Sequence, residues 1–356
     1  MRILIVGLGA IGQRHARNLR CMFADRVELL AARARGLTHV LSDALTVEAA
    51  DGLCEKYGIR SFSTLDEALT HKPDVAFVCN PTSLHIETSL ALARAGCHLF
   101  IEKPLAHEYS RVEQLLDVVE RQGLVATVGY QFRFHPCLAT AYDLLRSGAV
   151  GRTLAVRAEA GEYLPGWHAY EDYRGTYAGR RDLGGGVLLT QIHEMDYLYW
   201  FFGLPHTVFT VGGHLSSLDI DAEDVASTLM QFEQDGIRFP VHLHQDYVQQ
   251  PPTRRCEIVG DAGKLEVDLL RHTITLYGAT GGVVQSREFS DFQRGQMFID
   301  ETRHFLSCVE RHEAPVVTLL DAAESLRMAL AAKESLDKGV VVRVSRRDVS
   351  TMSDLK

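Results

Sequence analysis

Lys103 is the residue of this chain best placed by its sequence to move a proton. It stands in Glu102-Lys103-Pro104, directly after the apolar run Cys97–Ile101. In a dry site a lysine can hydrogen-bond a substrate hydroxyl and assist transfer of its proton. The alternative is an ordinary loop, because loops at strand ends serve structural and functional roles alike.

His193 is the second candidate for proton transfer. It follows Gly184-Gly185-Gly186, and Thr190, His193 and Asp196 recur every three residues, which places them on roughly one face of a helix. The imidazole could be a general acid or base oriented by Asp196, a metal ligand, or a buried structural group. Because these residues do not supply the several ligands that a metal requires, we predict no metal site.

The elements that would position these residues begin at the N-terminus. Residues 2–6 indicate a buried strand, Gly7-Leu8-Gly9-Ala10-Ile11-Gly12 a tight turn, and the following residues a helix. In such a motif the first glycine allows the turn, the second admits a pyrophosphate, and the third lets helix and strand pack closely. The helix N-terminus would then face the phosphates. The alternative is an unrelated strand-turn-helix.

Strands and helices alternate up to about residue 128. Helices are predicted over Ser42–Tyr57 and after the capping box Thr64-Leu65-Asp66-Glu67. Alternation of this kind predicts an α/β fold with a parallel, doubly wound sheet, here a Rossmann domain over residues 1–128. Such sheets bind ligands at the carboxyl ends of their strands. The segments expected at that edge are the glycine turn, Asn80-Pro81-Thr82, Glu102-Lys103-Pro104 and Gly129-Tyr130-Gln131.

The pattern changes after residue 128. Strands follow one another with short turns such as Gln234-Asp235-Gly236, which indicates antiparallel pairing. A helix over 184–202 interrupts them, and helices over 297–311 and 319–338 follow. We predict an α+β domain over 129–340 with a large open-faced, mostly antiparallel sheet, then a strand and tail over 341–356. The helix over 319–338 could pack back on the first domain. An uncovered sheet face predicts a homodimer or homotetramer.

The end of the second strand bears on the choice of cofactor. An acidic residue about 20 positions after the glycines would bind the ribose 2′-hydroxyl of NAD. The stretch 29–35 has no acid and carries Arg33 and Arg35 instead. Two guanidiniums can pair a 2′-phosphate, so NADP(H) is favoured and NAD(H) remains possible. The alternative is that both arginines are solvated loop residues.

Two stretches mix aromatic and polar residues, namely 130–136 at the domain crossover and 167–174. Such mixtures suit sugars, since rings stack on apolar sugar faces and hydroxyls need donors and acceptors. The alternative is a pair of surface loops. The residues predicted to contact the substrate are Lys103, Tyr130, Arg133, Trp167, Tyr173, Thr190 and His193.

Composition excludes other classes of function. The 356 residues are 46% hydrophobic and carry a net charge of -9 without a long basic run, which argues against nucleic acid as a partner. No apolar stretch of about 18 residues predicts a membrane span. Seven scattered cysteines without a CxxC pair indicate reduced thiols. Because the first strand starts at Arg2, we expect no signal peptide and a cytoplasmic location.

As a set, the motifs resemble the glucose-fructose oxidoreductase / inositol dehydrogenase / rhizopine catabolism (Gfo/Idh/MocA) family. The matching residues, in the family's order, are the glycine turn, Asn80-Pro81-Thr82 with His85, Glu102-Lys103-Pro104, and Gly184–Gly186 with His193 and Asp196. The resemblance implies a Rossmann domain, an open-faced sheet domain that mediates oligomerisation, and hydride transfer between a nicotinamide and a hydroxyl or keto carbon of a sugar, inositol or sugar nucleotide.

The resemblance also implies roles for residues. Lys103 would be the catalytic lysine and His193 the active-site histidine. The expected cofactor contacts are Gly7, Gly9, Ala10, Ile11, Gly12, Arg33, Arg35, Asn80, Pro81, Thr82, His85, Glu102, Lys103 and Gln131.

One position departs from the family pattern. Many members carry Asp-x-x-x-His, but here Leu189 stands four residues before His193, and the nearest equivalent is Thr190. Either Lys103 and His193 handle the proton alone, or another acid substitutes, or activity is reduced. The acids available are Glu194, Asp196 and Asp182. Two other functions stay open: a non-catalytic dinucleotide-binding sensor or assembly protein, and a glycoside-processing enzyme that recycles a tightly bound NAD.

Overall fold

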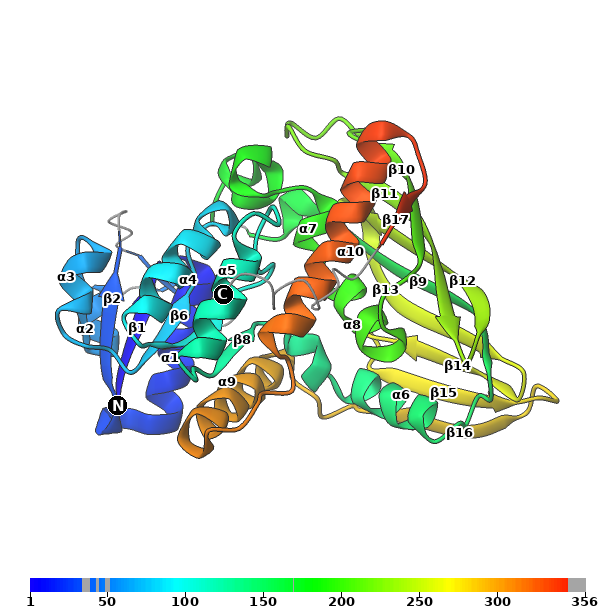
Figure 1. Cartoon of the computed structure of the whole chain (residues 1–356), viewed down its shortest axis with the longest axis horizontal. Coiled ribbons are helices and arrows are strands. Elements are labelled where there is room, and N and C mark those ends of the chain that lie inside the picture. The colour runs from blue at the N-terminus through cyan, green and yellow to red at the C-terminus, as the bar shows by residue number, and fades with distance from the viewer. Residues whose placement is uncertain (34–38, 43–44, 49–51, 169, 345–356) are drawn as a thin grey trace, which may run out of the picture.

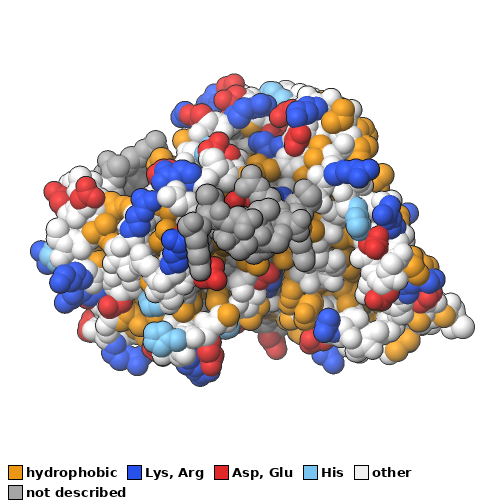
Figure 2. Space-filling view, in the orientation of Figure 1, with side chains coloured by type: hydrophobic (Ala, Val, Ile, Leu, Met, Phe, Trp, Pro, Cys, Tyr) orange, Lys and Arg blue, Asp and Glu red, His pale blue; other side chains and the backbone are white. Residues whose placement is uncertain are grey.

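The computed structural model describes residues 1–33, 39–42, 45–48, 52–168 and 170–344. Figure 1 shows two sheets at opposite ends of the molecule, with helix α10 (Leu319–Lys338) running between them. In Figure 2 acidic and basic side chains are interspersed over the visible face, as the mixed composition suggests. Within the described part, no helix is long and apolar enough to cross a bilayer.

The first sheet has six parallel strands in the order β5-β2-β1-β6-β7-β8, which confirms the doubly wound prediction. Its inner strands are apolar on both faces because helices cover both sides, as the fully buried Ile3, Leu4 and Ile5 show. The strands are β1 (Arg2–Val6), β2 (Glu28–Ala32), β5 (Ile59–Phe62), β6 (Val75–Val78), β7 (His98–Ile101) and β8 (Ala126–Val128).

The helix predicted over Ser42–Tyr57 is wrong. Short strands β3 (Val40–Leu41) and β4 (Val47–Glu48) pair antiparallel, and among the described residues of this stretch only α2 (Leu53–Tyr57) is helical. The Ser42 hydroxyl accepts the Thr46 amide at 3.1 Å and forms a turn, and β-branched residues such as Val47 favour extended backbone. The capping box at Thr64 is confirmed. The other helices along this sheet are α1 (Ala10–Phe23), α3 (Leu65–Leu69), α4 (His85–Arg94) and α5 (Val112–Arg121).

The second sheet has nine strands in the order β16-β15-β14-β13-β9-β12-β11-β10-β17. Every neighbouring pair is antiparallel except β9 and β12, so the mostly antiparallel prediction is confirmed. The edge strand β16 was not predicted, because it is largely polar, whereas the edge strand β17 lies within the strand and tail predicted over 341–356. The strands are β9 (Thr153–Tyr163), β10 (Thr207–Gly213), β11 (Val225–Gln234), β12 (Ile237–Asp246), β13 (Val248–Gly260), β14 (Gly263–Asp268), β15 (Thr273–Gly278), β16 (Val283–Glu288) and β17 (Val342–Arg343).

Helices cover one face of the second sheet, and Figure 1 shows them on the side toward the first sheet. Helix α6 (Pro136–Arg146) packs on β14 and β15, α8 (His193–Phe202) on β9 and β11, and α10 on β10. Helix α10 also contacts β8 and α5, while α9 (Arg294–Arg311) contacts α1. Helix α10 therefore joins the two sheets, and α9 packs on the first domain.

The helix predicted over 184–202 is two helices, α7 (Val187–Thr190) and α8. Gly184 and Gly186 precede them with φ of 85° and 103°, backbone that favours glycine. At the break, Gln191 Nε2 donates to the Asp246 carbonyl at 3.0 Å and Gln245 Nε2 donates to the Gln191 carbonyl at 2.7 Å. Thr190 and His193 thus belong to different helices and do not share one helical face, as was predicted for them.

Candidate functional site

Lys103 connects the end of a strand in the first sheet to helix α7 of the second domain. It follows β7, is half-buried, and its Nζ donates to the Thr190 carbonyl at 2.7 Å. Thr190 is the last residue of α7, where a helix leaves carbonyls without helical partners. The contact uses the backbone of Thr190, so it does not need the acid that many family members carry nearby. It fixes the ammonium group at the carboxyl edge of the parallel sheet.

His193 begins α8 and is only 4% exposed. Its ring stacks on Phe132 at 4.6 Å, and its Nε2 lies 3.2 Å from Nε2 of Gln131. With the Gln131 amide donating, the neutral imidazole carries its proton on Nδ1, which has no protein partner in the described residues. Burial, then the charges of Lys103, Arg254 and Arg294, lower the pKa of His193 well below its ordinary value. The imidazole is therefore a neutral donor at pH 7.

The three acids that could have replaced the missing carboxylate are engaged elsewhere. Asp196 does not orient His193, because it accepts two hydrogen bonds from Arg133 at 3.0 and 2.7 Å. Asp182 pairs with Arg180 in an exposed ion pair. Glu194 accepts from Arg254 at 2.8 and 3.0 Å. Each of these carboxylates is held by an arginine, so none of the three takes the place of the missing acid.

The glycine turn has the shape that a pyrophosphate requires. A Cβ at Gly7 would lie 2.8 Å from the Cys79 carbonyl oxygen, and one at Gly12 would lie 2.0 Å from the Gly7 oxygen. A Cβ at Gly9 would meet nothing within 4 Å. Gly9 is also the N-cap of α1, which has no side-chain cap, so the helix amides are free to bind an anion. These residues fit the phosphates of a dinucleotide.

The neighbouring strand ends are tied to each other. His85 Nδ1 lies 2.8 Å from the Pro104 oxygen and its Nε2 lies 2.9 Å from the Asn80 oxygen, which links the loops after β6 and β7. Glu102 Oε1 lies 2.7 Å from His15 Nε2 of α1. Asn80, Pro81, Thr82, Glu102 and Gln131 therefore share one edge with the glycine turn, as the parallel topology requires.

Arg33 and Arg35 are the two arginines predicted to contact the cofactor. Arg33 follows β2, is half-buried, and its Nη1 donates to Cys54 Sγ at 3.6 Å, a distance suited to a sulfur acceptor. Its backbone amide donates to the Phe62 carbonyl at 3.1 Å, which fixes the start of the loop. Arg35 lies outside the described residues.

The residues predicted to contact substrate separate into two groups. Tyr130 is fully buried with its hydroxyl unpartnered in the described part, and its ring lies 5.9 Å from His193. Trp167 packs edge-on against Tyr247 at 5.4 Å. The guanidinium of Arg133, by contrast, donates to the Asp196 carboxylate. The Tyr173 hydroxyl accepts a hydrogen bond from the Asp219 amide at 3.3 Å. Arg133 therefore holds α8 in place through Asp196.

Two arginines near His193 were missed from the sequence. Arg254 of β13 is 8% exposed, and its guanidinium lies 4.6 Å from the centre of the Phe132 ring. Arg294 is the first residue of α9 and is exposed. Neither belongs to a local motif. A buried arginine in a strand that faces a carboxylate on another element has no short-range signal, because its partner, Glu194, is 60 residues away.

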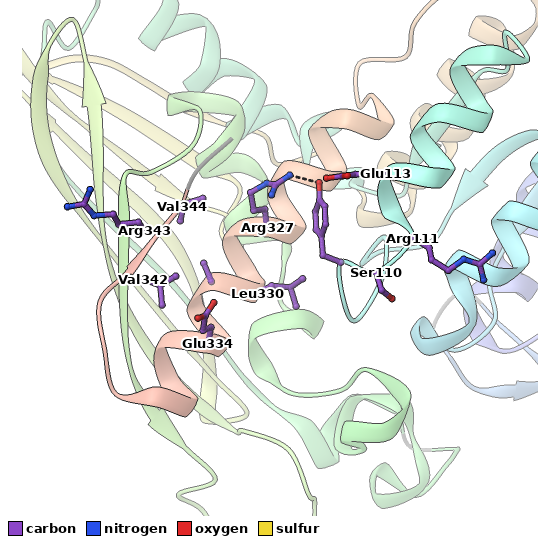
Figure 3. Close-up of a pocket in the computed structure, with 11 residues that line it drawn as sticks. Ser110, Arg111, Glu113, Arg327, Leu330, Glu334, Val342, Arg343 and Val344 are labelled. Atoms are coloured by element: carbon purple, nitrogen blue, oxygen red, sulfur yellow. Dashed lines mark hydrogen bonds between the residues drawn. The ribbon is translucent and has the colours of Figure 1, made fainter. Parts of the chain in front are cut away.

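A separate hollow of about 510 Å³ lies between α10, the segment before α5, and β17 (Figure 3). Arg327 donates to the Tyr109 hydroxyl across it, while Arg111 and Arg343 point away from it. Val344, the last described residue before the C-terminus, is part of its lining. The hollow contains neither Lys103 nor His193.

Comparison with known proteins gives two family matches. A model described as an oxidoreductase family with an NAD-binding Rossmann fold matches residues 1–130, and one described as a GFO/IDH/MocA C-terminal domain matches residues 138–266. The scyllo-inositol 2-dehydrogenase (NAD(+)) of Bacillus subtilis strain 168 is 25% identical over 356 residues, which cover 97% of this chain and 96% of that protein.

Two further relatives span the same length. The myo-inositol 2-dehydrogenase of Thermotoga maritima is 26% identical over 352 residues, covering 95% of this chain and 97% of that protein. The solved structure of a levoglucosan dehydrogenase, in complex with NADH and levoglucosan, has a TM-score of 0.80 at 19% identity and covers 97% of this chain and 100% of that one. The latter similarity shows that the fold is shared.

Proposed function

This chain belongs to the Gfo/Idh/MocA family of NAD-binding oxidoreductases, and we propose that Lys103 and His193 carry out its proton chemistry on a sugar, inositol or sugar-nucleotide substrate. The observation that supports this is the contact of Lys103 Nζ with the Thr190 carbonyl at 2.7 Å, beside a neutral His193. The relatives named above, two inositol dehydrogenases and a levoglucosan dehydrogenase, support the substrate class.

The nicotinamide of a dinucleotide whose pyrophosphate is held at the glycine turn would supply or accept the hydride at the substrate carbon. When a hydroxyl becomes a carbonyl, Lys103 accepts the proton of the substrate oxygen as a neutral amine and becomes an ammonium, and in the reverse direction the ammonium returns that proton. The Thr190 carbonyl accepts one N–H of the Lys103 side chain, which leaves its remaining N–H groups and, in the neutral amine, its lone pair for the substrate.

His193 orients the same oxygen. Its Nε2 is occupied by Gln131, so its Nδ1–H is the group that can donate to the substrate. Because its pKa is lowered, the imidazole stays neutral while Lys103 exchanges the proton, and the two groups do not compete. Phe132 on the ring face and the buried Tyr130 exclude water from this side. Holding the reactants in one geometry supplies much of the rate.

Substitution of Lys103 tests its proposed role in proton transfer. Lys103→Met should keep NADH binding in a calorimetric titration and lower turnover of a reactive polyol by about 10²–10⁴-fold, the usual contribution of a positioned acid or base. Lys338→Met, in an exposed pair with Glu334, is the control and should match the wild type. The panel is scyllo-inositol, myo-inositol, levoglucosan and D-glucose, followed by absorbance at 340 nm. Unchanged turnover in Lys103→Met would refute the assignment.

We further propose that the cofactor site prefers NADP(H) over NAD(H). The absence of an acid in 29–35, together with Arg33 at the end of β2, supports this. The test is the ratio of NADPH to NADH affinities, which should exceed one and fall several-fold in Arg33→Ala. Equal affinities in the wild type would exclude the preference and leave NAD(H) as the cofactor.

The uncovered face of the second sheet is proposed to form a homodimer or homotetramer. Val211 and Leu229 on adjacent strands of that face are 53% and 52% exposed, and exposed apolar patches mark interfaces. Leu229→Glu should shift the mass in sedimentation toward the monomer, whereas an unchanged mass would argue against this face.

All seven cysteines are free thiols, which supports the proposed cytoplasmic location.

A further inference from the structure

A segment of the second domain, between β9 and α7, reaches the carboxyl edge of the first sheet. A Cβ on Gly184 would lie 2.7 Å from the Cβ of His107, which follows β7, and 3.0 Å from the Cβ of Thr82, which follows β6. In the same segment, the centre of the Tyr170 ring lies 6.4 Å from that of His39, which stands between β2 and β3. The second domain thus contacts the edge at which a parallel sheet of this kind binds its ligand.

His39 is tied to the glycine turn through Gln13. The Gln13 side chain, fully buried in the first turn of α1, donates from Nε2 to the His39 carbonyl at 3.3 Å and accepts the Leu41 amide at 2.8 Å. The same Nε2 lies 3.3 Å from the Leu8 carbonyl within the glycine turn. In doubly wound nucleotide-binding folds, residues that follow the second strand flank the ribose of the adenosine half. His39 therefore marks the adenosine end of the site whose pyrophosphate lies at the glycine turn.

Contacts within the second domain hold the Tyr170 ring at this end. The ring stacks on that of His168, with centres 5.2 Å apart and planes at 27°. The Nδ1 of His168 in turn lies 2.8 Å from a carboxylate oxygen of Glu171. Tyr170 is half-buried, and burial, followed by the charge of Glu171, raises the pKa of its phenol, which stays neutral at pH 7. Each domain therefore contributes an aromatic ring here, His39 from the first and Tyr170 from the second.

We propose that Tyr170 binds the adenosine half of the dinucleotide, so that a residue of the second domain completes the cofactor site. The flat faces of adenine stack on aromatic side chains, and a neutral phenol ring beside an imidazole offers such a surface. The inference rests on the proposed function only in assuming a dinucleotide, because it uses neither Lys103 nor His193. It extends the cofactor site from the Rossmann domain to the segment before α7.

Binding of two probes to the full chain tests the inference without turnover. NADH carries both halves of the dinucleotide, whereas ADP-ribose keeps the adenosine half and lacks the nicotinamide. Calorimetry gives the affinity of each for the wild type and for Tyr170→Leu. The leucine variant should bind both probes about fivefold or more weakly, because removal of an aromatic ring that stacks on a base has an effect of this size. A loss seen with NADH and not with ADP-ribose would place Tyr170 at the nicotinamide half and overturn the inference.

Further variants separate stacking on adenine from a purely structural role. Tyr170→Phe keeps the ring and should bind both probes as the wild type does, as should the control Tyr277→Leu on β15 of the second sheet. Tyr170→Trp should bind ADP-ribose well and add tryptophan fluorescence that ADP-ribose quenches.

The inference is wrong if Tyr170→Leu binds ADP-ribose as the wild type does, or if Tyr170→Trp shows no added quenching. The quenching decides the outcome even where Tyr170→Leu lowers the unfolding midpoint. Lys103→Met should bind ADP-ribose normally. Full turnover in Lys103→Met would therefore refute the proposed function and leave the Tyr170 result standing.

Discussion

The glycine turn and the region around His193 occupy neighbouring parts of one site, yet they are built in opposite ways. The turn consists of six consecutive residues and creates space by leaving out side chains. The region around His193 draws on β7, η3, α8 and β13 and fixes side chains with buried ion pairs. Adding an atom to the glycine turn should therefore weaken ligand binding there. Removing a charge from the region around His193 should instead lower the stability of the protein.

The largest effect is expected from Asp196→Asn. This change leaves the buried Arg133, at 2% side-chain exposure, without its hydrogen-bonded carboxylate and with only Asp321, 3.7 Å away, as counter-charge. Breaking a buried pair of this kind costs about 3–5 kcal/mol of unfolding free energy. Denaturant unfolding followed by fluorescence measures it. Asp182→Asn removes a carboxylate from the exposed pair with Arg180 and should leave the midpoint where it is. Equal shifts in the two variants would mean that burial of the pair does not stabilise α8.

The region around His193 should also be the more acid-sensitive of the two. Burial, followed by the charges of His272 and Arg254, lowers the pKa of His135 to about 4. In the unfolded chain this group binds a proton near pH 6.5, so stability is full above pH 6.5 and is lost as the pH falls toward 4. The loss is about 3 kcal/mol at about 1.4 kcal/mol per pKa unit.

His135→Asn removes the titrating group and keeps an N-cap for α6, since the His135 side chain now accepts the Cys137 amide. Unfolding free energies at pH 7 and pH 4 should differ by about 3 kcal/mol less in this variant than in the wild type. The same difference in both proteins would show that other groups account for the acid sensitivity.

The smallest effect isolates the glycine turn. Gly9→Ala adds a Cβ that meets no protein atom within 4 Å, so stability should not change, while the approach of the pyrophosphate is obstructed. We expect cofactor affinity to fall about tenfold, or about 1.4 kcal/mol, in calorimetry. Gly12→Ala, whose Cβ would overlap the Gly7 oxygen, should lower affinity and stability together. Gly295→Ala, also without neighbours, is the control, and an unaffected cofactor affinity in Gly9→Ala would show that Gly9 does not line the phosphate site.

The two regions also differ in how far the sequence predicted them. The glycine turn, the Thr64 capping box and the strand ends at Asn80 and Glu102 follow from residues that interact within a few positions of each other. The helix over 42–57 failed because a side-chain turn at Ser42 and extended β4 outweighed helical patterning. The break between α7 and α8 was not predicted, because one of its two side-chain hydrogen bonds comes from Gln245, over fifty positions away along the chain.

Local chemistry along the chain was enough to establish the family and the parallel and antiparallel sheets, and it singled out Lys103 and His193, which we propose as the reactive groups. Backbone turns, helix caps and strand patterns depend on residues a few positions apart, and these can be read from the sequence. The partners of Asp196, Glu194 and His193 came from folding alone, since a buried charge takes whichever opposite charge the packed elements bring to it.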